Sequence, residues 1–254
     1  MSSQHPSDPR SDVLEGVATD AAGTPEQWDS VDVDPVPADG GLLAPVKPHL
    51  RGWLHAGMAP VALVLGIVLV IFSPPQYRWA AALYSLTAIM LFGTSAVYHR
   101  FTWSERTRVL LKRLDHSNIF LIIAGSYTPF AVVLLPADQE RTLLILVWSG
   151  ALAGVLFRVF WVGAPRWLYT PIYIALGWVA IFYLPAFWEA GGPLVVILLA
   201  LGGICYSVGG VVYALKRPNP SPTWFGFHEV FHALTLMGFL TQYVAVSLVL
   251  YGAR

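Results

Sequence analysis

Residues 227–232 read FHEVFH, and the two histidines of this stretch have the spacing of metal ligands. In an α-helix, side chains four positions apart lie one turn apart on the same face, so His228 and His232 can present ring nitrogens to one point. The pattern H-E-x-x-H is also the zinc-protease motif, in which the glutamate acts as general base. Two ligands do not complete a metal site, so the remaining groups have to come from elsewhere in the chain.

The apolar character of the chain decides the setting of these residues. The chain has 254 residues, of which 56% are hydrophobic and only 12% are charged, and its mean hydropathy is +0.60. These values are typical of an integral membrane protein and exclude an ordinary water-soluble domain. The one cysteine, Cys205, lies inside an apolar run, so the chain has no disulfide framework.

The N-terminal part has a different composition from the rest. Nine of the fifteen acidic residues fall within residues 1–46, together with a single arginine. This part is rich in Ser, Pro, Gly and Asp, so we expect a disordered acidic tail rather than a cleaved signal peptide. The remaining domain, residues 47–254, holds fourteen basic and six acidic residues. A basic membrane domain suits anionic lipid headgroups, so we expect membrane lipids, and not nucleic acid, as partners.

Seven apolar stretches of this domain are long enough to cross a bilayer. About 20 residues are needed to span roughly 30 Å of hydrocarbon at 1.5 Å per residue. The predicted spans are residues 53–73, 78–99, 115–135, 142–163, 168–188, 193–215 and 224–251. The sequence therefore predicts an all-α integral membrane protein that folds as a seven-transmembrane helix bundle.

Basic residues are distributed unevenly over the two sides of these spans. Eleven Lys and Arg residues precede the first span or lie in the connections between spans two and three, four and five, and six and seven, whereas the other side holds three. The positive-inside rule then places the N-terminus in the cytoplasm and the C-terminus outside. We expect a multi-pass protein of the cell membrane.

Polar residues gather at the predicted cytoplasmic ends of several spans. Ser95 and His99 lie four positions apart at the end of the second span, Asp115 begins the third, and His55 lies near the start of the first. Because the spans alternate in direction, all of them lie at the depth of the histidines in residues 227–232. A lone histidine at this depth is typical of the membrane interface, but several together with a carboxylate indicate a site. Three neutral imidazoles with one open position form a zinc site of the hydrolytic type.

The same residues carry a family resemblance. The segments Ser95-x-x-x-His99, Leu114-Asp115-His116 and His228-x-x-x-His232 resemble the three motifs of the hemolysin III branch of the progestin and adipoQ receptor superfamily. These are seven-span proteins, related more distantly to alkaline ceramidases. Residues 173–178 and 202–209 resemble the motifs of the fifth and sixth spans, and the whole resemblance covers about residues 47–252.

The resemblance implies a cofactor and a set of site residues. It implies that Zn²⁺ is held by His99, His228 and His232. It also implies that Asp115 lies beside the open coordination position and that Ser95 is hydrogen-bonded close by. The arrangement it implies for the termini, N-terminus inside and C-terminus outside, agrees with the charge distribution.

Two carboxylates compete for the role of general base. Glu229 lies about 100° around the helix from its neighbouring histidine. We therefore favour Asp115 as the base, with Ser95 polarising or orienting the substrate. His116 points about 100° away from Asp115 and is interpreted as a supporting or interfacial residue, while His49 is expected to be exposed.

These residues lead to a functional hypothesis and two alternatives. A zinc ion with an open position lowers the pKa of water to about 7 and polarises a carbonyl, which suits amide or ester hydrolysis. Within a bilayer the substrates are lipids, so we predict a zinc-dependent hydrolase of a lipid amide or ester, which the resemblance links to membrane homeostasis. The alternatives are a non-catalytic sensor or regulator of membrane state stabilised by zinc, and a cytolytic pore-forming protein.

Overall fold

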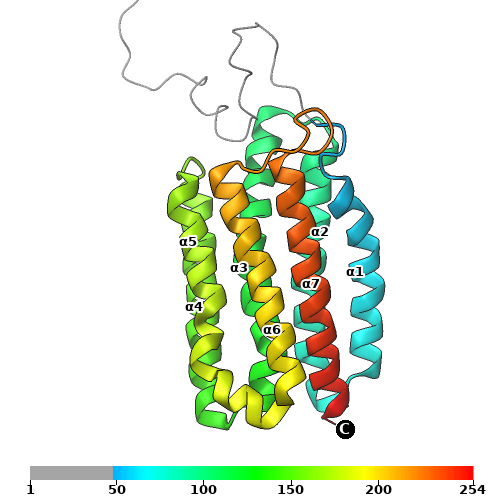
Figure 1. The fold of residues 1–254 in the computed structure, drawn as a ribbon, viewed down its shortest axis with the longest axis vertical. Helices are drawn as coiled ribbons and strands as arrows, with labels where there is room; N and C mark the ends of the chain where they lie inside the picture. The colour runs from blue at the N-terminus through cyan, green and yellow to red at the C-terminus, as the bar shows by residue number, and fades with distance from the viewer. Residues whose placement is uncertain (1–47, 254) are drawn as a thin grey trace, which may run out of the picture. The chain divides into compact units, whose positions relative to one another are not determined.

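The computed structural model describes residues 48–253, and within this range the chain is helical (Figure 1). The predicted tail, residues 1–46, lies outside the described residues. The elements are α1 (Trp53–Phe72), η2 (Pro75–Tyr77), α2 (Arg78–Arg100), α3 (Glu105–Leu134), α4 (Ala137–Phe160), α5 (Arg166–Gly177), η3 (Trp178–Tyr183), α6 (Leu184–Leu215) and α7 (Phe227–Gly252). The prediction of an all-α membrane protein is confirmed for this part of the chain.

Six helical segments of the described residues are long and apolar enough to cross a membrane. Five of them correspond to the predicted spans one to four and seven. The start of α3 differs most from the prediction, since this helix begins at Glu105 and not at residue 115. Ser104 caps it, because its side chain accepts the backbone N–H of Thr107 at 3.5 Å. The first turns of α3 are rich in basic residues. The predicted span, which was chosen for its apolar length, therefore did not include them.

The sixth candidate segment, residues 166–215, is 50 residues long and replaces the two spans predicted for this region. At 1.5 Å per residue a straight helix of this length would reach about 75 Å, more than twice the thickness of a hydrocarbon core. The helix is interrupted at Gly192, where φ is 78° and ψ is 172°. Glycine adopts this conformation without a steric penalty. The chain reverses direction near this residue, between the end of η3 and the rising part of α6 (Figure 1).

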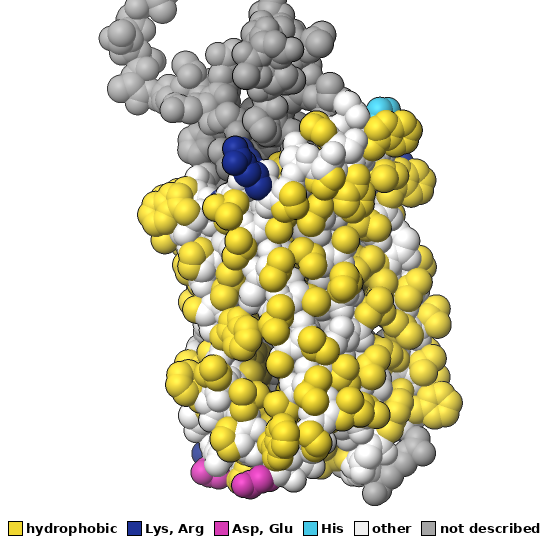
Figure 2. Space-filling view, in the orientation of Figure 1, with side chains coloured by type: hydrophobic (Ala, Val, Ile, Leu, Met, Phe, Trp, Pro, Cys, Tyr) yellow, Lys and Arg dark blue, Asp and Glu magenta, His cyan; other side chains and the backbone are white. Residues whose placement is uncertain are grey.

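The outer faces of the helices are apolar (Figure 2). In the most apolar window of α1 and of α4, only 28% of the residues are buried. Val64, Ile145 and Phe182 illustrate the exposed side chains, with 59%, 63% and 81% of their surface accessible. A soluble bundle would bury these side chains, so the surface is that of a multi-pass membrane protein.

Small residues set the closest helix contacts. A Cβ atom at Gly154 of α4 would collide with the ring of Phe120 on α3. One at Gly202 of α6 would lie 2.7 Å from Cγ of Gln242 on α7. The missing side chains of Gly154 and Gly202 therefore allow α4 to approach α3 and α6 to approach α7 closely. At Gly203 the nearest atom would be 3.8 Å away, so this glycine makes no comparably close contact.

The two ends of the bundle differ in charge. We call the end where α1 and α7 begin and α2 ends the basic end. It includes Arg100, which lies over the ring of Trp53, and Arg51, which pairs with Glu229. The opposite end holds the turn between α1 and α2 and the turn between α3 and α4. Figure 2 shows Lys and Arg near the basic end of the visible face and acidic side chains at the opposite end.

Candidate metal centre

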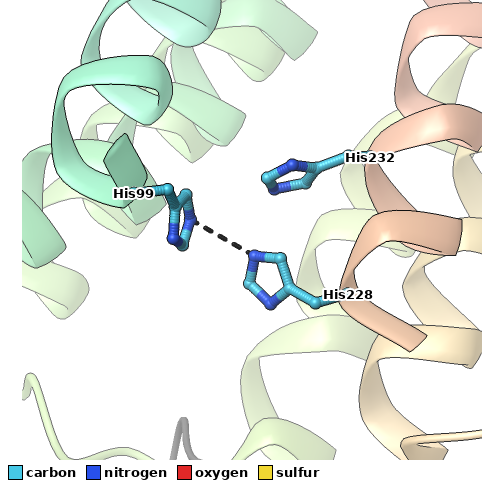
Figure 3. A group of neighbouring side chains, drawn as sticks. All are labelled: His99, His228 and His232. Atoms are coloured by element: carbon cyan, nitrogen blue, oxygen red, sulfur yellow. Dashed lines mark hydrogen bonds between the residues drawn. The ribbon is translucent and has the colours of Figure 1, made fainter. Parts of the chain in front are cut away.

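Three histidines lie together at the basic end (Figure 3). His99 is in the last turn of α2, and His228 and His232 are in the first two turns of α7. One ring nitrogen from each lies within 4.8 Å of the others, and all three side chains are buried. The structure therefore brings together the imidazoles that the sequence analysis grouped, and this trio could hold a metal ion.

One pair of nitrogen atoms in the trio has the separation of two ligands of a tetrahedral cation. Two ligands of a tetrahedral zinc, each about 2.0–2.1 Å from the metal, lie about 3.3 Å apart. Nε2 of His228 lies 3.2 Å from Nε2 of His99, which matches this separation. The ring centroids of His99 and His232 are 5.2 Å apart, and those of His228 and His232 are 4.5 Å apart. The donors are three nitrogen atoms, a set that zinc accepts readily.

The start of α7 is fixed by hydrogen bonds that involve Glu229. The Oε2 atom of Glu229 accepts the backbone N–H of Gly226, the residue before α7, at 2.8 Å, which caps the first turn of the helix. Its Oε1 atom accepts Nε–H of Arg51 at 2.5 Å, and Glu229 is only 1% exposed. In addition, Asn219 accepts the backbone N–H of Phe227 at 3.0 Å. Glu229 thus anchors the helix that carries the two histidines.

Asp115 and Ser95 lie beside the trio. Oδ2 of Asp115 is 3.9 Å from Nε2 of His99 and 3.8 Å from Nδ1 of His116. Ser95 lies one turn before His99 on α2 and is 1% exposed. Both residues line the cavity described below. Both residues therefore lie near the trio, and the roles assigned to them from the sequence stay predictions.

His116 is buried in a polar network at the basic end. Its Nδ1 atom lies 2.8 Å from the backbone oxygen of Lys112, so this nitrogen carries the proton and donates it. Nε2 then accepts the hydroxyl of Tyr213 at 3.2 Å, and the hydroxyl of Tyr213 accepts that of Tyr169 at 3.2 Å. Only 6% of His116 is exposed, so of its two interpretations the supporting residue agrees with the structure and the interfacial one does not.

His55 of α1 packs directly against the trio. Its ring stacks on that of His232, with the centroids 3.7 Å apart and the planes inclined by 12°. On the other side it meets the ring of Phe92 edge to face at 5.1 Å. Both of its ring nitrogens are buried without a hydrogen-bond partner among the described residues. The sequence placed His55 near the site but did not predict this stack.

A segment before α1 closes the basic end next to the trio. The backbone N–H groups of His49 and Leu50 donate to the oxygens of Thr223 and Trp224 at 3.0 and 3.3 Å. Although His49 is exposed as expected, its ring stacks on that of Trp224 at 4.6 Å. A Cβ atom at Gly52, whose φ is 79°, would lie 2.7 Å from Cβ of His99. The sequence analysis missed this closure, because only the charge of Arg51 drew attention to the segment.

A cavity leads from the trio into the bundle. Its polar lining near the trio includes His55, Ser95, Asp115, His228 and His232. Along α7 it reaches from His228 to Gln242, which corresponds to about 21 Å at 1.5 Å per residue. Most of the deeper lining is aliphatic or aromatic. Asp115 is the only Asp, Glu, Lys or Arg among the residues that line it.

The break between α5 and α6 forms part of the cavity wall. Residues of η3 line it, and the freed backbone groups there bind Tyr127 of α3. The hydroxyl of Tyr127 donates to the oxygen of Gly177 at 2.6 Å and accepts the N–H of Ala180 at 2.7 Å. Such irregular backbone is tolerated at membrane depth only where it is satisfied inside the protein. Tyr127 and Trp178 line the cavity, whereas Phe92 packs against Phe239.

Two arginines that the sequence analysis counted only as topology charges are buried at the basic end. Arg158 is 1% exposed, lies over the ring of Tyr169 at 4.3 Å, and donates to the oxygens of Trp161 and Val162 at the end of α4. Arg166 lies over the ring of Tyr213 at 4.4 Å. Cations near a helix C-terminus stabilise its last carbonyls. These contacts anchor the helix ends around the trio.

Comparison with known proteins adds a family to this geometry. Residues 43–243 match the model of the family described as "Haemolysin-III related". The chain is 30% identical over 188 residues to the "Hemolysin-3 homolog" of Bacillus subtilis (strain 168), which covers 72% of this chain and 88% of that protein. It is 27% identical over 206 residues to "Hemolysin-3" of Bacillus cereus, covering 79% and 91%.

A plant protein is also similar. The "Heptahelical transmembrane protein ADIPOR2" of Oryza sativa subsp. japonica is 25% identical over 189 residues, which covers 68% of this chain and 82% of the relative. The matched range of the family model includes Ser95, His99, Asp115, His228 and His232. The resemblance drawn from the sequence motifs is therefore confirmed.

Proposed function

This chain belongs to the haemolysin-III related family, and from this premise we propose that it is a seven-span zinc protein that hydrolyses a lipid amide or ester. The observation that carries the proposal is the buried trio of His99, His228 and His232 at the mouth of an apolar cavity. Metal-binding imidazoles inside a membrane protein favour chemistry on a substrate that enters from the lipid.

The proposed topology has the N-terminus in the cytoplasm and the C-terminus outside. It counts residues 166–215 as two spans, because this segment is interrupted at Gly192 and is too long for one crossing. The name of the rice relative, which calls that protein heptahelical, supports the count. The basic residues at the end where α1 begins support the orientation by the positive-inside rule. The cell membrane is the proposed location.

The proposed division of labour in the site follows from its donors. When zinc is bound, it supplies a Lewis acid that polarises a carbonyl and makes water more acidic. Asp115, the only carboxylate in the cavity lining, accepts a proton as the oxygen of water adds to the carbonyl carbon. The bond from carbon to the leaving nitrogen or oxygen then breaks, and Asp115 returns the proton to that atom. The products are a carboxylic acid and an amine or alcohol, while Ser95 orients the carbonyl.

The cavity supports a lipid as the substrate. It extends about 21 Å along α7 beyond His228, and its deeper lining is mostly apolar, as an acyl chain requires. Among the described residues no Lys or Arg lines it, which disfavours a phosphorylated group next to the reacting carbonyl. The proposed substrate is therefore an acyl chain joined to a neutral group.

The test is metal analysis and lipid hydrolysis on the purified protein. Wild type and the control variant His49→Ala should contain zinc and release fatty acid from at least one lipid amide or ester. His232→Ala should lose both. Retained hydrolysis in a zinc-free His232→Ala protein would refute the proposal.

A non-catalytic role is the second candidate, and the packing of the helices favours it. Within residues 48–253, α2 packs chiefly on α1 and α3, whereas α7 packs chiefly on α6. A metal at the trio would therefore join two helices that are not principal packing partners of each other, as a structural zinc does. Here zinc removal should lower the unfolding temperature while no lipid product ever appears.

The names of the two Bacillus relatives suggest cytolysis as a third candidate. The charged and histidine side chains of the cavity lining gather at the basic end, and the deeper lining is mostly apolar. The cavity therefore does not form a continuous polar path through the bundle, which argues against a pore. Release of a trapped dye from liposomes at a defined protein dose tests this candidate.

A further inference from the structure

Two of the three histidines lack the partner that normally orients a metal-binding imidazole. Such a histidine usually donates its second ring N–H to a carboxylate, a backbone oxygen or water, which fixes the ring plane. Nδ1 of His228 and Nδ1 of His232 are buried and have no hydrogen-bond partner within residues 48–253. Something other than a hydrogen bond must therefore hold these rings in place.

Ring packing replaces the missing hydrogen bond at His232. His55 covers one face of this imidazole, with the centroids 3.7 Å apart and the planes within 12° of parallel. His55 is held in turn by the edge contact with Phe92 at 5.1 Å, and Phe92 is wedged against Phe239 at 5.0 Å. His55 is 2% exposed, and Phe92 is fully buried. The plane of His232 thus depends on a stack that links α1, α2 and α7.

His228 shows the same arrangement with other rings. Tyr213 of α6 lies 5.7 Å from it at an interplanar angle of 71°, and Phe231 lies 6.0 Å away at 86°. These are edge contacts, which restrain a ring less than a parallel stack that covers its whole face. His55 therefore makes the closest ring contact of the group.

The stack also excludes His55 as a fourth ligand in this arrangement. A metal lies close to the plane of each imidazole that binds it, about 2.0–2.1 Å from the nitrogen. Two nearly parallel rings whose centroids are 3.7 Å apart cannot both have the same ion in their planes. The contribution of His55 must therefore pass through His232.

We propose that His55 is a positioning residue of the metal centre, which fixes the ring plane of His232 by stacking. This inference rests on the proposed metal site. The aromatic face of His55 takes the role that a carboxylate or a carbonyl oxygen has in most metal sites. The ring of residue 55 matters for metal affinity, and its two nitrogen atoms do not, because neither has a hydrogen-bond partner among the described residues.

Three substitutions of His55 distinguish the contribution of the flat ring from that of its nitrogen atoms and from that of the side-chain volume. His55→Phe keeps a ring of similar size, His55→Leu keeps volume without a flat face, and His55→Ala removes both. Zinc affinity is measured by competition with a chelator on detergent-purified protein, together with the unfolding temperature of the metal-free protein. Met58→Ala is the matched control, since Met58 is a buried residue one turn along α1 that belongs to the apolar core.

The expected result is a 10–100-fold loss of zinc affinity in His55→Leu and His55→Ala, which is the usual loss when the residue that orients a ligand is removed. His55→Phe and Met58→Ala should keep the wild-type affinity. If His55→Leu binds zinc as wild type does, His55 only fills space and the proposal is wrong. If His55→Phe loses zinc as His55→Ala does, the nitrogens matter and the proposal is also wrong.

The same measurements distinguish this proposal from the one on which it rests. A wild-type protein that binds no zinc would overturn the metal site and the role of His55 together. A wild type that binds zinc and hydrolyses no lipid, with the expected order of affinities at position 55, would overturn the hydrolase and confirm the positioning role. The two failures therefore give different results.

Discussion

At the basic end of the bundle many buried side chains are polar or charged, whereas at the opposite end most of them are aliphatic or aromatic. The buried polar set at the basic end includes Arg51, His99, Arg158, His228 and Glu229. The buried set at the opposite end includes Leu69, Leu143, Phe187, Val249 and Leu250. Apolar side chains need only a matching volume, but each buried polar group also needs a partner. The comparison indicates that one end of the bundle serves packing alone and the other is built around a site.

The largest effect is expected from a substitution in the trio at the basic end, which should abolish metal binding. His232→Ala removes one of three ligands, and the remaining two cannot hold a zinc ion as the full trio does. We expect the zinc content of the purified protein to fall from about one ion per chain to near zero. His49→Ala, which changes an exposed histidine at the same end, should leave it unchanged. Equal zinc content in the two variants would mean that the trio is not the metal site.

The next largest effect is expected at the proposed base. Asp115→Asn keeps the size of the side chain but cannot accept a proton, so turnover should fall about 10²–10⁴-fold. Zinc content should stay at the wild-type level, because this carboxylate lies 3.9 Å from Nε2 of His99 and is not a member of the trio. Turnover and zinc content are measured on the same preparation. Wild-type turnover in Asp115→Asn would require another base.

A third prediction compares how a substitution at each end affects stability and zinc affinity. Removing one partner of a buried ion pair typically destabilises a protein by about 3–5 kcal/mol, so Glu229→Ala should lower the stability by about this amount. It should also weaken zinc binding, because the hydrogen bond from the N–H of Gly226 to Glu229, which caps α7 next to His228, is lost. Leu143→Ala, at the opposite end, should cost about 2–5 kcal/mol through the cavity that it leaves, with unchanged zinc affinity.

Denaturant titration and chelator competition measure the two effects separately. The double variant Arg51→Leu with Glu229→Leu is the control for the ion pair, since replacing both partners by apolar groups should recover part of the stability. The contradicting result is that Leu143→Ala weakens zinc binding as much as Glu229→Ala does when both lose the same stability. Zinc binding would then depend equally on both ends of the bundle.

Helical periodicity and span direction predicted the common depth of the histidines, and the family resemblance distinguished the trio from His55. Four-residue spacing places His228 and His232 on one face, and the alternation of spans brings His99 to their depth. These arguments need only the rise and the twist of a helix, which hardly vary. The same arguments put Asp115 and Ser95 beside the trio, where the structure has them.

Helix rotation and side-chain direction could not be predicted in the same way. The ion pair of Arg51 with Glu229 joins positions 178 residues apart and depends on how α7 is turned about its axis. Periodicity showed only that Glu229 faces away from its neighbouring histidine, so its part in capping α7 stayed hidden. The break at Gly192 falls between the predicted spans 168–188 and 193–215. The distorted stretch η3 was missed, since apolar composition gives the length of a span but not its interruptions.

The smallest expected effect compares two buried threonines. Thr128 of α3 lies toward the opposite end, where its hydroxyl donates to the oxygen of Ala124 at 3.0 Å and accepts Nε1–H of Trp148 at 3.2 Å. Thr170 of α5 lies at the basic end and lines the cavity, and its hydroxyl is buried without a partner among the residues that the structure describes. Replacement by valine keeps the shape and removes the hydroxyl at both positions.

Thr128→Val should lower the stability by about 1–3 kcal/mol, because it leaves the indole N–H of Trp148 unsatisfied in the core. Thr170→Val should leave the stability nearly unchanged, since no protein group loses a hydrogen bond. Denaturant titration measures the free energy of unfolding of both variants. Lipid turnover by Thr170→Val tests whether a lipid in the cavity interacts with the hydroxyl of Thr170. A stability loss at Thr170 equal to that at Thr128 would show that the hydroxyl has a structural partner. The polar groups of the basic end would then serve packing as those of the opposite end do.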